Sequence, residues 1–469
     1  MFRRLALLSF ACACLVGCSM APQYHRPEAP VAASWPSGQA YQASSTPSDA
    51  PPAAEQKWRA FFVAPQLQQL IELALANNRD LRVAALNVAR SRAQFRIRRA
   101  DLLPTLAVAG SAAAQRLPAD LSPSGQAMIA RNDNLSVGLS SYEVDLLGRV
   151  GSLKDQALDQ YLASEQARLS VQIGLVAEVA NNYLTLAADR ERLQLARDTL
   201  ESQQTSYRLV ERRLASGVAS ELDLRQVQTS VAAARVDVAR FTSLVAQGEN
   251  LLTLVVGAEP PRELLPGDLR AVGTLRELPP GVPSAVLQRR PDVLAAELQL
   301  MAANANIGAA RAAFFPRITL TSSIGTASAQ LSGLFSSGSL AWGFVPRLNL
   351  PIFDYGRNRA GLSVAERDRD IFLARYEKTL QSAFREVADA LAQNGTLGDQ
   401  LQAQQSLTEA SAASYRLAEA RYQGGVTSYL NVLDSQRAVY AARQGLIGVN
   451  LARLSNQVTL YKVLGGGSE

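Results

Sequence analysis

Residues that could perform catalysis or bind a metal are scarce in this chain of 469 residues. It contains one histidine, His25, and three cysteines, all within the first 18 residues. The sequence has no histidine, cysteine and carboxylate cluster at metal-ligand spacing, and no glycine-rich loop that leads into a helix, as a phosphate site requires. Gly465–Gly467 instead follows a helical pattern, which indicates a helix end. We therefore expect a protein that is not an enzyme and needs no metal or cofactor.

The one residue with a clear chemical fate is Cys18. It ends the sequence Leu15–Cys18, which follows two arginines and an apolar stretch too short to span a bilayer. This pattern is similar to the lipobox of bacterial lipoproteins, so we expect residues 1–17 to be a signal peptide and Cys18 to carry N-acyl and S-diacylglycerol lipid. Cys12 and Cys14 leave with the signal peptide, and no disulfide is expected.

The chain is basic, with a formal net charge of +6. Five arginines lie close together on one predicted helix, at Arg90, Arg92, Arg96, Arg98 and Arg99. Such a cluster could bind nucleic acid, but an exported lipoprotein meets none. We interpret it as a solvated helix face near lipid headgroups and expect membrane lipids, not nucleic acid, as partners.

Long helical patterns occupy most of the chain. None of the 21 prolines falls in 124–259 or in 352–469. A helix of about 60 residues reaches about 90 Å at roughly 1.5 Å per residue, which is far longer than a globular helix. Within the first span, apolar residues follow a heptad spacing typical of packed helices, namely Val227, Val231, Ala234, Val238, Phe241 and Val245.

The two halves of the chain share landmarks in the same order, 208 to 212 residues apart. Arg213–Leu224 returns as Arg421–Val432, and the Arg-Ala pair at Arg99 returns at Arg311. We interpret this as a two-fold internal repeat, because a period this long is not a solenoid unit. The predicted organisation is a signal peptide (1–17), a lipidated extended tether (18–65), a first repeat (66–258), a linker (259–284), a second repeat (285–464) and a tail (465–469).

Each repeat is predicted to contain a helix that ends before a proline, a strand hairpin and two further helices. The first helix covers Leu67–Leu102 in one repeat and Pro291–Ala313 in the other. The strands alternate with period 2 and have about the ~10 residues that a tilted transmembrane strand needs. They are predicted at Thr105–Gln115, Asn134–Leu146, Arg317–Ser328 and Ala341–Phe353, with Trp342 and Phe344 as membrane-interface aromatics.

Four membrane strands cannot remain an open sheet, because the edge N–H and C=O groups would be unpaired in lipid. The chain must therefore close a barrel with copies of itself. Two chains give eight strands and three give twelve, and only the larger barrel is wide enough for a lumen. The residues alone favour more than one chain and do not choose between these numbers.

Motifs spread over nearly the whole chain carry a family resemblance: Tyr24–Pro30, Asn77–Arg82, Ala93–Asp101, Gln288–Leu294, Ala302–Pro316 and Tyr461–Gly467. The chain resembles the TolC-like outer membrane factors of Gram-negative tripartite efflux pumps, most closely the OprM/OprJ lipoprotein branch. The resemblance implies a mixed α/β membrane protein and a homotrimer, with a 12-stranded outer membrane β-barrel continued by a long periplasmic α-helical barrel. It also implies two partners, a periplasmic adaptor (membrane fusion) protein and an inner membrane RND transporter, and a role as passive exit duct for drugs.

The same resemblance assigns site residues near the two repeated Gly-Val turns. It implies that adaptor-docking turns lie at Gly217, Val218, Ala219, Gly425, Val426 and Thr427. It implies a periplasmic gate with a charged ring at Asp434, a gate tyrosine at Tyr422 and a facing carboxylate at Asp223. The chain departs from TolC at Asn431, where a second ring aspartate stands, and at Thr427, where a gate arginine stands. The charge network of the gate therefore differs from that of TolC.

Three other functions are weighed against this one. An enzyme would need a site made of carboxylates alone. A structural periplasmic lipoprotein without a pore would share the long helices but not the strand hairpins at matched positions. An exit duct for type I polypeptide secretion would share the whole fold and differ only in its partner.

Overall fold

The computed structural model describes residues 19–41, 56–270 and 284–466. Cys18 and the predicted signal peptide lie outside these residues. The chain divides into two compact units, and several helices contribute residues to both. Of the described residues, unit 1 contains 19–28, 87–164 and 295–376, and unit 2 contains 29–41, 56–86, 165–270, 284–294 and 377–466.

The elements follow the order that the sequence predicts. The helices are α2 Trp58–Phe61, α3 Pro65–Asn77, α4 Arg79–Ala100, α5 Arg149–Ala215, α6 Glu221–Val256, α7 Pro291–Ala312, α8 Arg357–Gln423 and α9 Tyr429–Val463, with short 3-10 turns η2 Arg262–Leu264, η4 Ser284–Arg289 and η5 Leu331–Gly333. The strands are β1 Leu106–Leu117, β2 Met128–Val144, β3 Arg317–Ser328 and β4 Leu340–Asn349. Among the described residues, no helix is both long enough and apolar enough to cross a membrane.

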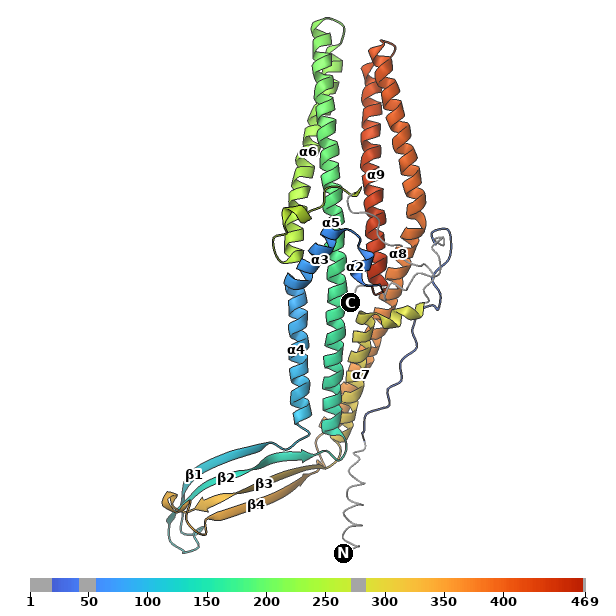
Figure 1. The fold of residues 1–469 in the computed structure, drawn as a ribbon. Coiled ribbons are helices and arrows are strands. Elements are labelled where there is room, and N and C mark those ends of the chain that lie inside the picture. The colour runs from blue at the N-terminus through green and yellow to red at the C-terminus, as the bar shows by residue number, and fades with distance from the viewer. Residues whose placement is uncertain (1–18, 42–55, 271–283, 467–469) are drawn as a thin grey trace. The chain divides into compact units, whose positions relative to one another are not determined.

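Unit 1 is built on one antiparallel sheet of four strands in the order β1-β2-β3-β4 (Figure 1). Leu106 pairs with Leu139 across β1 and β2, and Ser322 pairs with Phe344 across β3 and β4. The register shifts in β2 between Leu139 and Tyr142, where Ser141 has a φ of 56°. A bulge of this kind bends a strand and increases its twist. Among the residues that the structure describes, no strand pairs with the outer edge of β1 or of β4.

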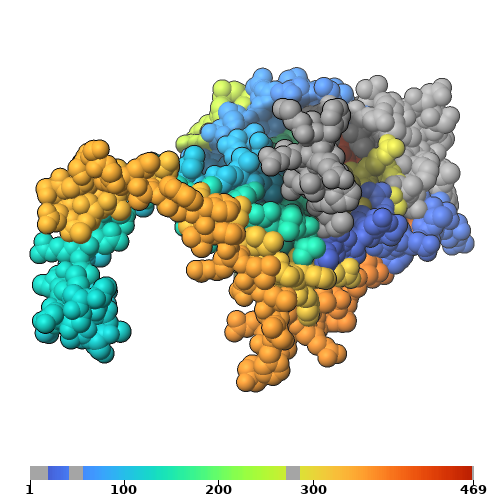
Figure 2. Space-filling model, turned by 90° about the horizontal axis from the view of Figure 1, so that it is seen from below, coloured from blue at the N-terminus to red at the C-terminus, as the bar shows by residue number. Residues whose placement is uncertain are grey.

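The two faces of this sheet differ in character. The strand register places one set of mainly apolar side chains on the same face, including Leu106, Val108, Leu135, Val137, Ile318, Ile324, Leu340, Trp342, Phe344 and Leu348. The other face carries mainly small and polar residues, including Ala109, Ser111, Asn134, Ser136, Thr319, Thr321, Ser323, Gly343 and Arg347. No residue in these four strands is buried. In Figure 2 the residues of the four strands form a curved band.

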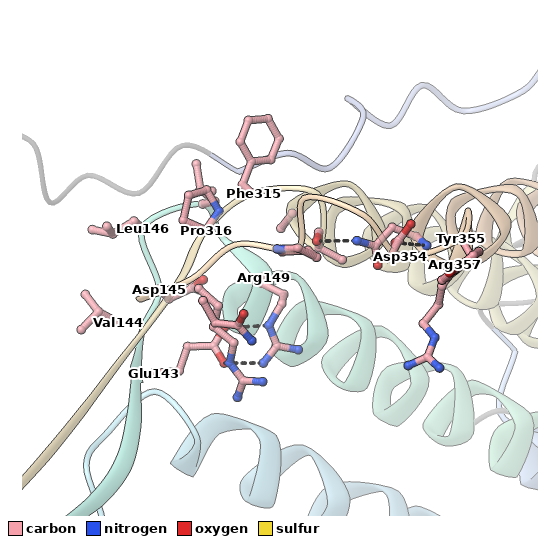
Figure 3. Close-up of a pocket in the computed structure, with 17 residues that line it drawn as sticks. Glu143, Val144, Asp145, Leu146, Arg149, Phe315, Pro316, Asp354, Tyr355 and Arg357 are labelled. Atoms are coloured by element: carbon pink, nitrogen blue, oxygen red, sulfur yellow. Dashed lines mark hydrogen bonds and ion pairs between the residues drawn. The ribbon is translucent and has the colours of Figure 1, made fainter. Parts of the chain in front are cut away.

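The strands join the helices of unit 1 through an ion-pair cluster (Figure 3). The carboxylate of Glu143 in β2 accepts two hydrogen bonds of 2.7 Å from Arg149, the first residue of α5. The same carboxylate lies 2.5 Å from the guanidinium of Arg317, the first residue of β3. Asp354 caps the start of α8 by accepting a hydrogen bond from the backbone N–H of Asn358 at 2.9 Å. These residues border a cavity of about 630 Å³.

Unit 2 contains the packed core of the chain around α2, α3 and α9. Phe61 and Phe62 are fully buried, and Phe61 stacks on Tyr461 with a centroid distance of 4.1 Å. The hydroxyl of Tyr461 donates a 2.5 Å hydrogen bond to the carbonyl of Gln56. The predicted tether (18–65) therefore extends too far, because its last residues belong to the folded core of unit 2.

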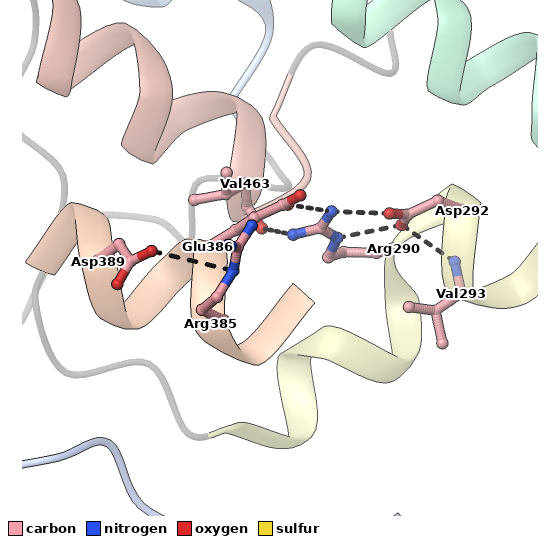
Figure 4. A network of polar contacts seen from close by, with 7 residues as sticks. All are labelled: Arg290, Asp292, Val293, Arg385, Glu386, Asp389 and Val463. Atoms are coloured by element: carbon pink, nitrogen blue, oxygen red, sulfur yellow. Dashed lines mark hydrogen bonds and ion pairs between the residues drawn. The ribbon is translucent and has the colours of Figure 1, made fainter. Parts of the chain in front are cut away.

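Two equivalent hydrogen bonds hold the ends of α6 and α9 in unit 2. Asn78, just before α4, donates a 2.8 Å hydrogen bond to the carbonyl of Val255, and Arg290, just before α7, donates a 2.9 Å hydrogen bond to that of Val463. The Arg290 side chain is 9% exposed and also pairs with Asp292 at 2.7 Å and with Glu386 at 2.9 Å (Figure 4).

Asn78 also ends the single long helix predicted over Leu67–Leu102. Its side chain accepts a hydrogen bond from the backbone N–H of Leu81, which makes it the N-cap of α4 and divides the predicted helix into α3 and α4. The predicted linker (259–284) contains the 3-10 turn η2, and its residues 271–283 lie outside the described residues.

Candidate functional site

The candidate site lies in unit 2 at the two turns that join α5 to α6 and α8 to α9. Both turns use the same backbone geometry. Gly217 has a φ of 74°, and the N–H of Val218 donates a 2.8 Å hydrogen bond to the carbonyl of Arg213. Gly425 has a φ of 73°, and the N–H of Val426 donates a 2.9 Å hydrogen bond to the carbonyl of Arg421. This is the Schellman ending of a helix, in which the residue after the helix is left-handed and favours glycine.

Both turns expose apolar side chains. Val218 is 67% exposed and Val426 is 66% exposed, and Leu222 in the first turn of α6 is 65% exposed. A Cβ at Gly217 or at Gly425 would meet no atom within 4 Å. The turns thus present equivalent open surfaces that nothing in the chain covers among its described residues.

The residues that follow each turn begin the next helix in different ways. Ser220 and Asp223 form a capping box, in which the carboxylate of Asp223 accepts a 2.9 Å hydrogen bond from the N–H of Ser220. In the second turn, the Asn431 amide donates a hydrogen bond to the hydroxyl of Thr427. Asp223 thus caps the start of α6, and the two residues at which the chain departs from TolC, Asn431 and Thr427, bond to one another.

A cluster of apolar and aromatic side chains joins all four helices next to the turns. Its buried members are Val210 from α5, Val227 from α6, and Tyr429, Val432 and Leu433 from α9, with Tyr415, Ala418 and Tyr422 of α8 packed against them. Burial raises the pKa of the Tyr429 hydroxyl to about 12. The cluster fixes the two helical hairpins to one another just behind the turns.

Tyr422, the predicted gate tyrosine, connects the two hairpins. Its ring lies 5.1 Å from the ring of Tyr429, and the guanidinium of Arg213 lies 4.8 Å from its centroid. A cation–π contact at a partly exposed site contributes about 0.5–1 kcal/mol. Sequence reasoning missed Arg213, because nothing in the sequence shows that the end of α5 lies beside the end of α8.

Two polar contacts farther along α9 were also missed. The Tyr440 hydroxyl donates a 2.9 Å hydrogen bond to the carboxylate of Asp237 in α6, and Gln436 donates a 3.3 Å hydrogen bond to Ser202 in α5. Burial, reinforced by the bond to Asp237, raises the pKa of Tyr440 to about 12. These contacts hold α9 against both helices of the first hairpin.

Asp434, the predicted ring residue, is held loosely. Its side chain is 64% exposed, and its carboxylate lies 3.6 Å from the guanidinium of Arg437, one turn further along α9. Among the described residues, no hydrogen bond or ion pair links it to Tyr422, Asp223 or Asn431. The single chain therefore places Asp434 on an open helix surface near the second turn and does not bring the predicted gate residues together.

The comparisons with known proteins agree with this architecture. Residues 70–258 and 282–466 match the family described as Outer membrane efflux protein. The chain is 51% identical over 465 residues to the probable efflux pump outer membrane protein TtgC of Pseudomonas putida, which covers 98% of this chain and 96% of that protein. It is 46% identical over 457 residues to outer membrane protein OprJ of Pseudomonas aeruginosa, with 97% and 94% covered.

A solved structure extends the likeness to three dimensions. The open state of the Neisseria gonorrhoeae MtrE outer membrane channel has a TM-score of 0.86 and 37% sequence identity, and the match covers 96% of this chain and 99% of that one. The fold, the length of the matched regions and the family match therefore all indicate the same family. The chain belongs to the outer membrane efflux protein family.

Proposed function

We propose that the protein is the outer membrane exit duct of a tripartite multidrug efflux pump. It passively conducts drugs and other small molecules from an inner membrane transporter and a periplasmic adaptor to the cell exterior. TtgC is named as an efflux pump outer membrane protein and MtrE as an outer membrane channel, and both match nearly the full length of this chain. The same function places the protein in the outer membrane.

The observation that carries this proposal is the four-stranded sheet of unit 1. Within the described part of the chain, its apolar face is uncovered and the edges of β1 and β4 are unpaired. An apolar outer face opposite a small or polar inner face is the pattern of outer membrane barrel strands. Exposed strand edges cannot remain open in lipid, where each unpaired backbone group costs several kcal/mol.

The edges can be closed if β4 of one copy pairs with β1 of the next. In that arrangement α8, which follows β4, comes to lie beside α4 of the next copy, which leads into β1. This fits the exposure of α4, a helix of 22 residues of which none is buried within one chain. A second copy is thus the natural cover for both the sheet edge and the uncovered helix.

Three copies give twelve strands, which leaves room for a lumen, whereas the eight strands of two copies enclose an interior that side chains fill. We therefore propose a homotrimer with a 12-stranded barrel continued by a periplasmic helical barrel. A two-fold internal repeat accounts for the two helices of equal length, α5 and α8, each of 67 residues. The exposed turns at Gly217–Ala219 and Gly425–Thr427 are the proposed adaptor-docking surface, and Asp434, Tyr422, Asp223 and Asn431 the proposed gate.

Detergent-extracted protein is expected to be a trimer that conducts ions in planar bilayers. Its mass, from light scattering, should be three times that of one chain, and its electrophoretic mobility should change on boiling because the barrel then opens. A pore-free periplasmic spacer would show neither conductance nor a heat-dependent shift. A monomer with native strand content by circular dichroism would contradict the closure by association.

Cys18→Ala is expected to abolish labelling of the protein by radioactive palmitate. The expectation follows from the Leu15–Cys18 motif, since no other cysteine remains once the signal peptide has been removed. The trimer should still form, because the strands supply a membrane anchor of their own. Labelling that persists in the variant would overturn the assignment of Cys18.

A further inference from the structure

The segment just after Cys18 is bound along one side of α7 in unit 1. Arg26 donates two hydrogen bonds to the carboxylate of Glu297, from Nε at 2.6 Å and from Nη2 at 2.7 Å. The hydroxyl of Tyr24 donates a 3.2 Å hydrogen bond to the same carboxylate. The Glu297 side chain is 8% exposed, whereas that of Arg26 is 48% exposed. A carboxylate this buried needs its charged partner, so Glu297 and the bound segment depend on one another.

Further contacts continue toward the end of α7. The side chain of Asn304 donates a 2.8 Å hydrogen bond to the carbonyl of Pro22. At Gly308, an added Cβ would lie 2.7 Å from the backbone nitrogen of Ala21 and 2.6 Å from the hydroxyl of Ser152. Only a glycine allows the segment to come this close to the helix.

The segment follows α7 over about four turns. Arg26 is bound at Glu297, and the carbonyl of Met20 lies 3.5 Å from the guanidinium of Arg311. Fourteen residues of helix, from Glu297 to Arg311, span about 21 Å. Between these two contacts the segment has no helix or strand and bends once, at Ala21.

We propose that residues 20–26 form a strap, bound along α7, that sets the point at which the lipid on Cys18 enters the membrane. The strap is bound to Glu297 through Arg26, packs against α7 at Gly308 and ends beside Arg311, in the last turn of α7 before β3. Two further residues reach about 7 Å, so the lipid is held close to the start of the strands. The inference rests on the proposed acylation of Cys18.

Reactivity of a cysteine placed in the strap tests whether it is bound. Pro22→Cys in the purified full-length protein should react slowly with a membrane-impermeant maleimide, because residue 22 is half-buried and its carbonyl is bound by Asn304 of α7. Glu297→Gln or Gly308→Ala should raise that rate about tenfold or more, which corresponds to about 1.4 kcal/mol in the release of the strap. A cysteine at the exposed position Gln23 should react quickly in every background. Equal rates for Pro22→Cys in all backgrounds would overturn the strap.

A matched glycine controls for the effect of alanine on a helix. Gly398 lies in α8 with no atom within 4 Å of an added Cβ. Glycine to alanine in a helix interior normally stabilises it. Gly398→Ala should therefore leave the maleimide rate of Pro22→Cys unchanged. If Gly398→Ala raised this rate as much as Gly308→Ala does, the effect would not be specific to the contact at Gly308.

A change of length tests whether the strap sets the position of the lipid. Deletion of Met20 and Ala21 should pull the lipid about 7 Å away from the strands and lower the yield of heat-modifiable trimer in the outer membrane. Insertion of Gly-Ser after Ser19 should leave the yield unchanged, because added residues can loop out. Equal yields from the deletion and the insertion would overturn the proposal that the strap positions the lipid. Palmitate labelling of the same samples separates the two proposals, since its absence from the unaltered protein would overturn acylation itself.

Discussion

Gly425→Pro is expected to abolish the drug resistance that the protein supports, while the trimer remains assembled. Gly425 has a φ of 73°, and its N–H donates a 3.0 Å hydrogen bond to the carbonyl of Tyr422. Proline fixes φ near −65° and has no N–H, so the turn must adopt another backbone path. The strain is of the order of 1–3 kcal/mol, which is small beside the packing of helices as long as α8. The exposed side chain of Val426 would then point elsewhere, and the adaptor would lose its docking surface.

Gly425→Asn is the matched control at the same position. Asparagine adopts the left-handed conformation more readily than other residues with a side chain, and an added Cβ meets no atom within 4 Å. This variant should keep most of the resistance. Inhibitory drug concentrations would be measured in a strain that lacks its own outer membrane factors and carries the cognate adaptor and transporter. Trimer would be quantified by heat-dependent mobility. Full resistance in Gly425→Pro would remove this turn from the docking surface, and loss of the trimer would make the glycine a folding requirement instead.

Much of the fold could be predicted from local pattern. Arg317–Ser328 was predicted as a strand from its period-2 alternation, and β3 has these bounds. Helix α7 ends at Ala312, four residues before the proline at Pro316. In α6, most of the heptad positions are buried, including Val227, Ala234 and Phe241. These features depend on periodicity and on residues that stop an element, both of which are visible in a short window.

The break at Asn78 and the binding of the N-terminal segment could not be predicted in this way. Asn78 lies in a helical pattern without glycine or proline, and its second hydrogen bond goes to Val255, 177 residues away. The segment after Cys18 has no periodicity, and the partner of Arg26 is 271 residues away. Contacts of this range depend on which helices become neighbours, and composition predicts only that the segment is extended.

The positions of the two turns in the candidate site could be predicted from the sequence, but the side-chain contacts around them could not. The glycines at 217 and 425 were identified from the repeated motif, and their positive φ explains the residue type. The contact of Arg213 with Tyr422 depends on the packing of two hairpins. The residues of the proposed gate would meet only between copies of the chain. Their geometry therefore depends on the assembled trimer and not on the fold of one chain.

Asp434→Asn is expected to change single-channel conductance and to weaken the preference for cations in planar bilayers. The Asp434 side chain is 64% exposed, and its ion pair with Arg437, at 3.6 Å, is an exposed contact of little strength. Three such carboxylates around the trimer axis would attract cations and repel anions at a constriction. Asparagine keeps the size of the side chain and removes its charge. Losing about 1 kcal/mol of interaction with a permeating ion changes relative permeability roughly fivefold.

Asp389 in α8 offers a matched control. Its side chain is 65% exposed and its carboxylate lies 4.0 Å from Arg385, so it resembles Asp434 in both exposure and pairing. It lies far along the chain from both turns, and Asp389→Asn removes the same charge from a place where no ring is proposed. Conductance and ion preference should therefore be unchanged in Asp389→Asn and altered in Asp434→Asn, measured as reversal potentials in a salt gradient. Equal effects of the two variants would mean that the lumen responds to total charge, and no effect of either would leave Asp434 as a solvated helix residue outside the gate.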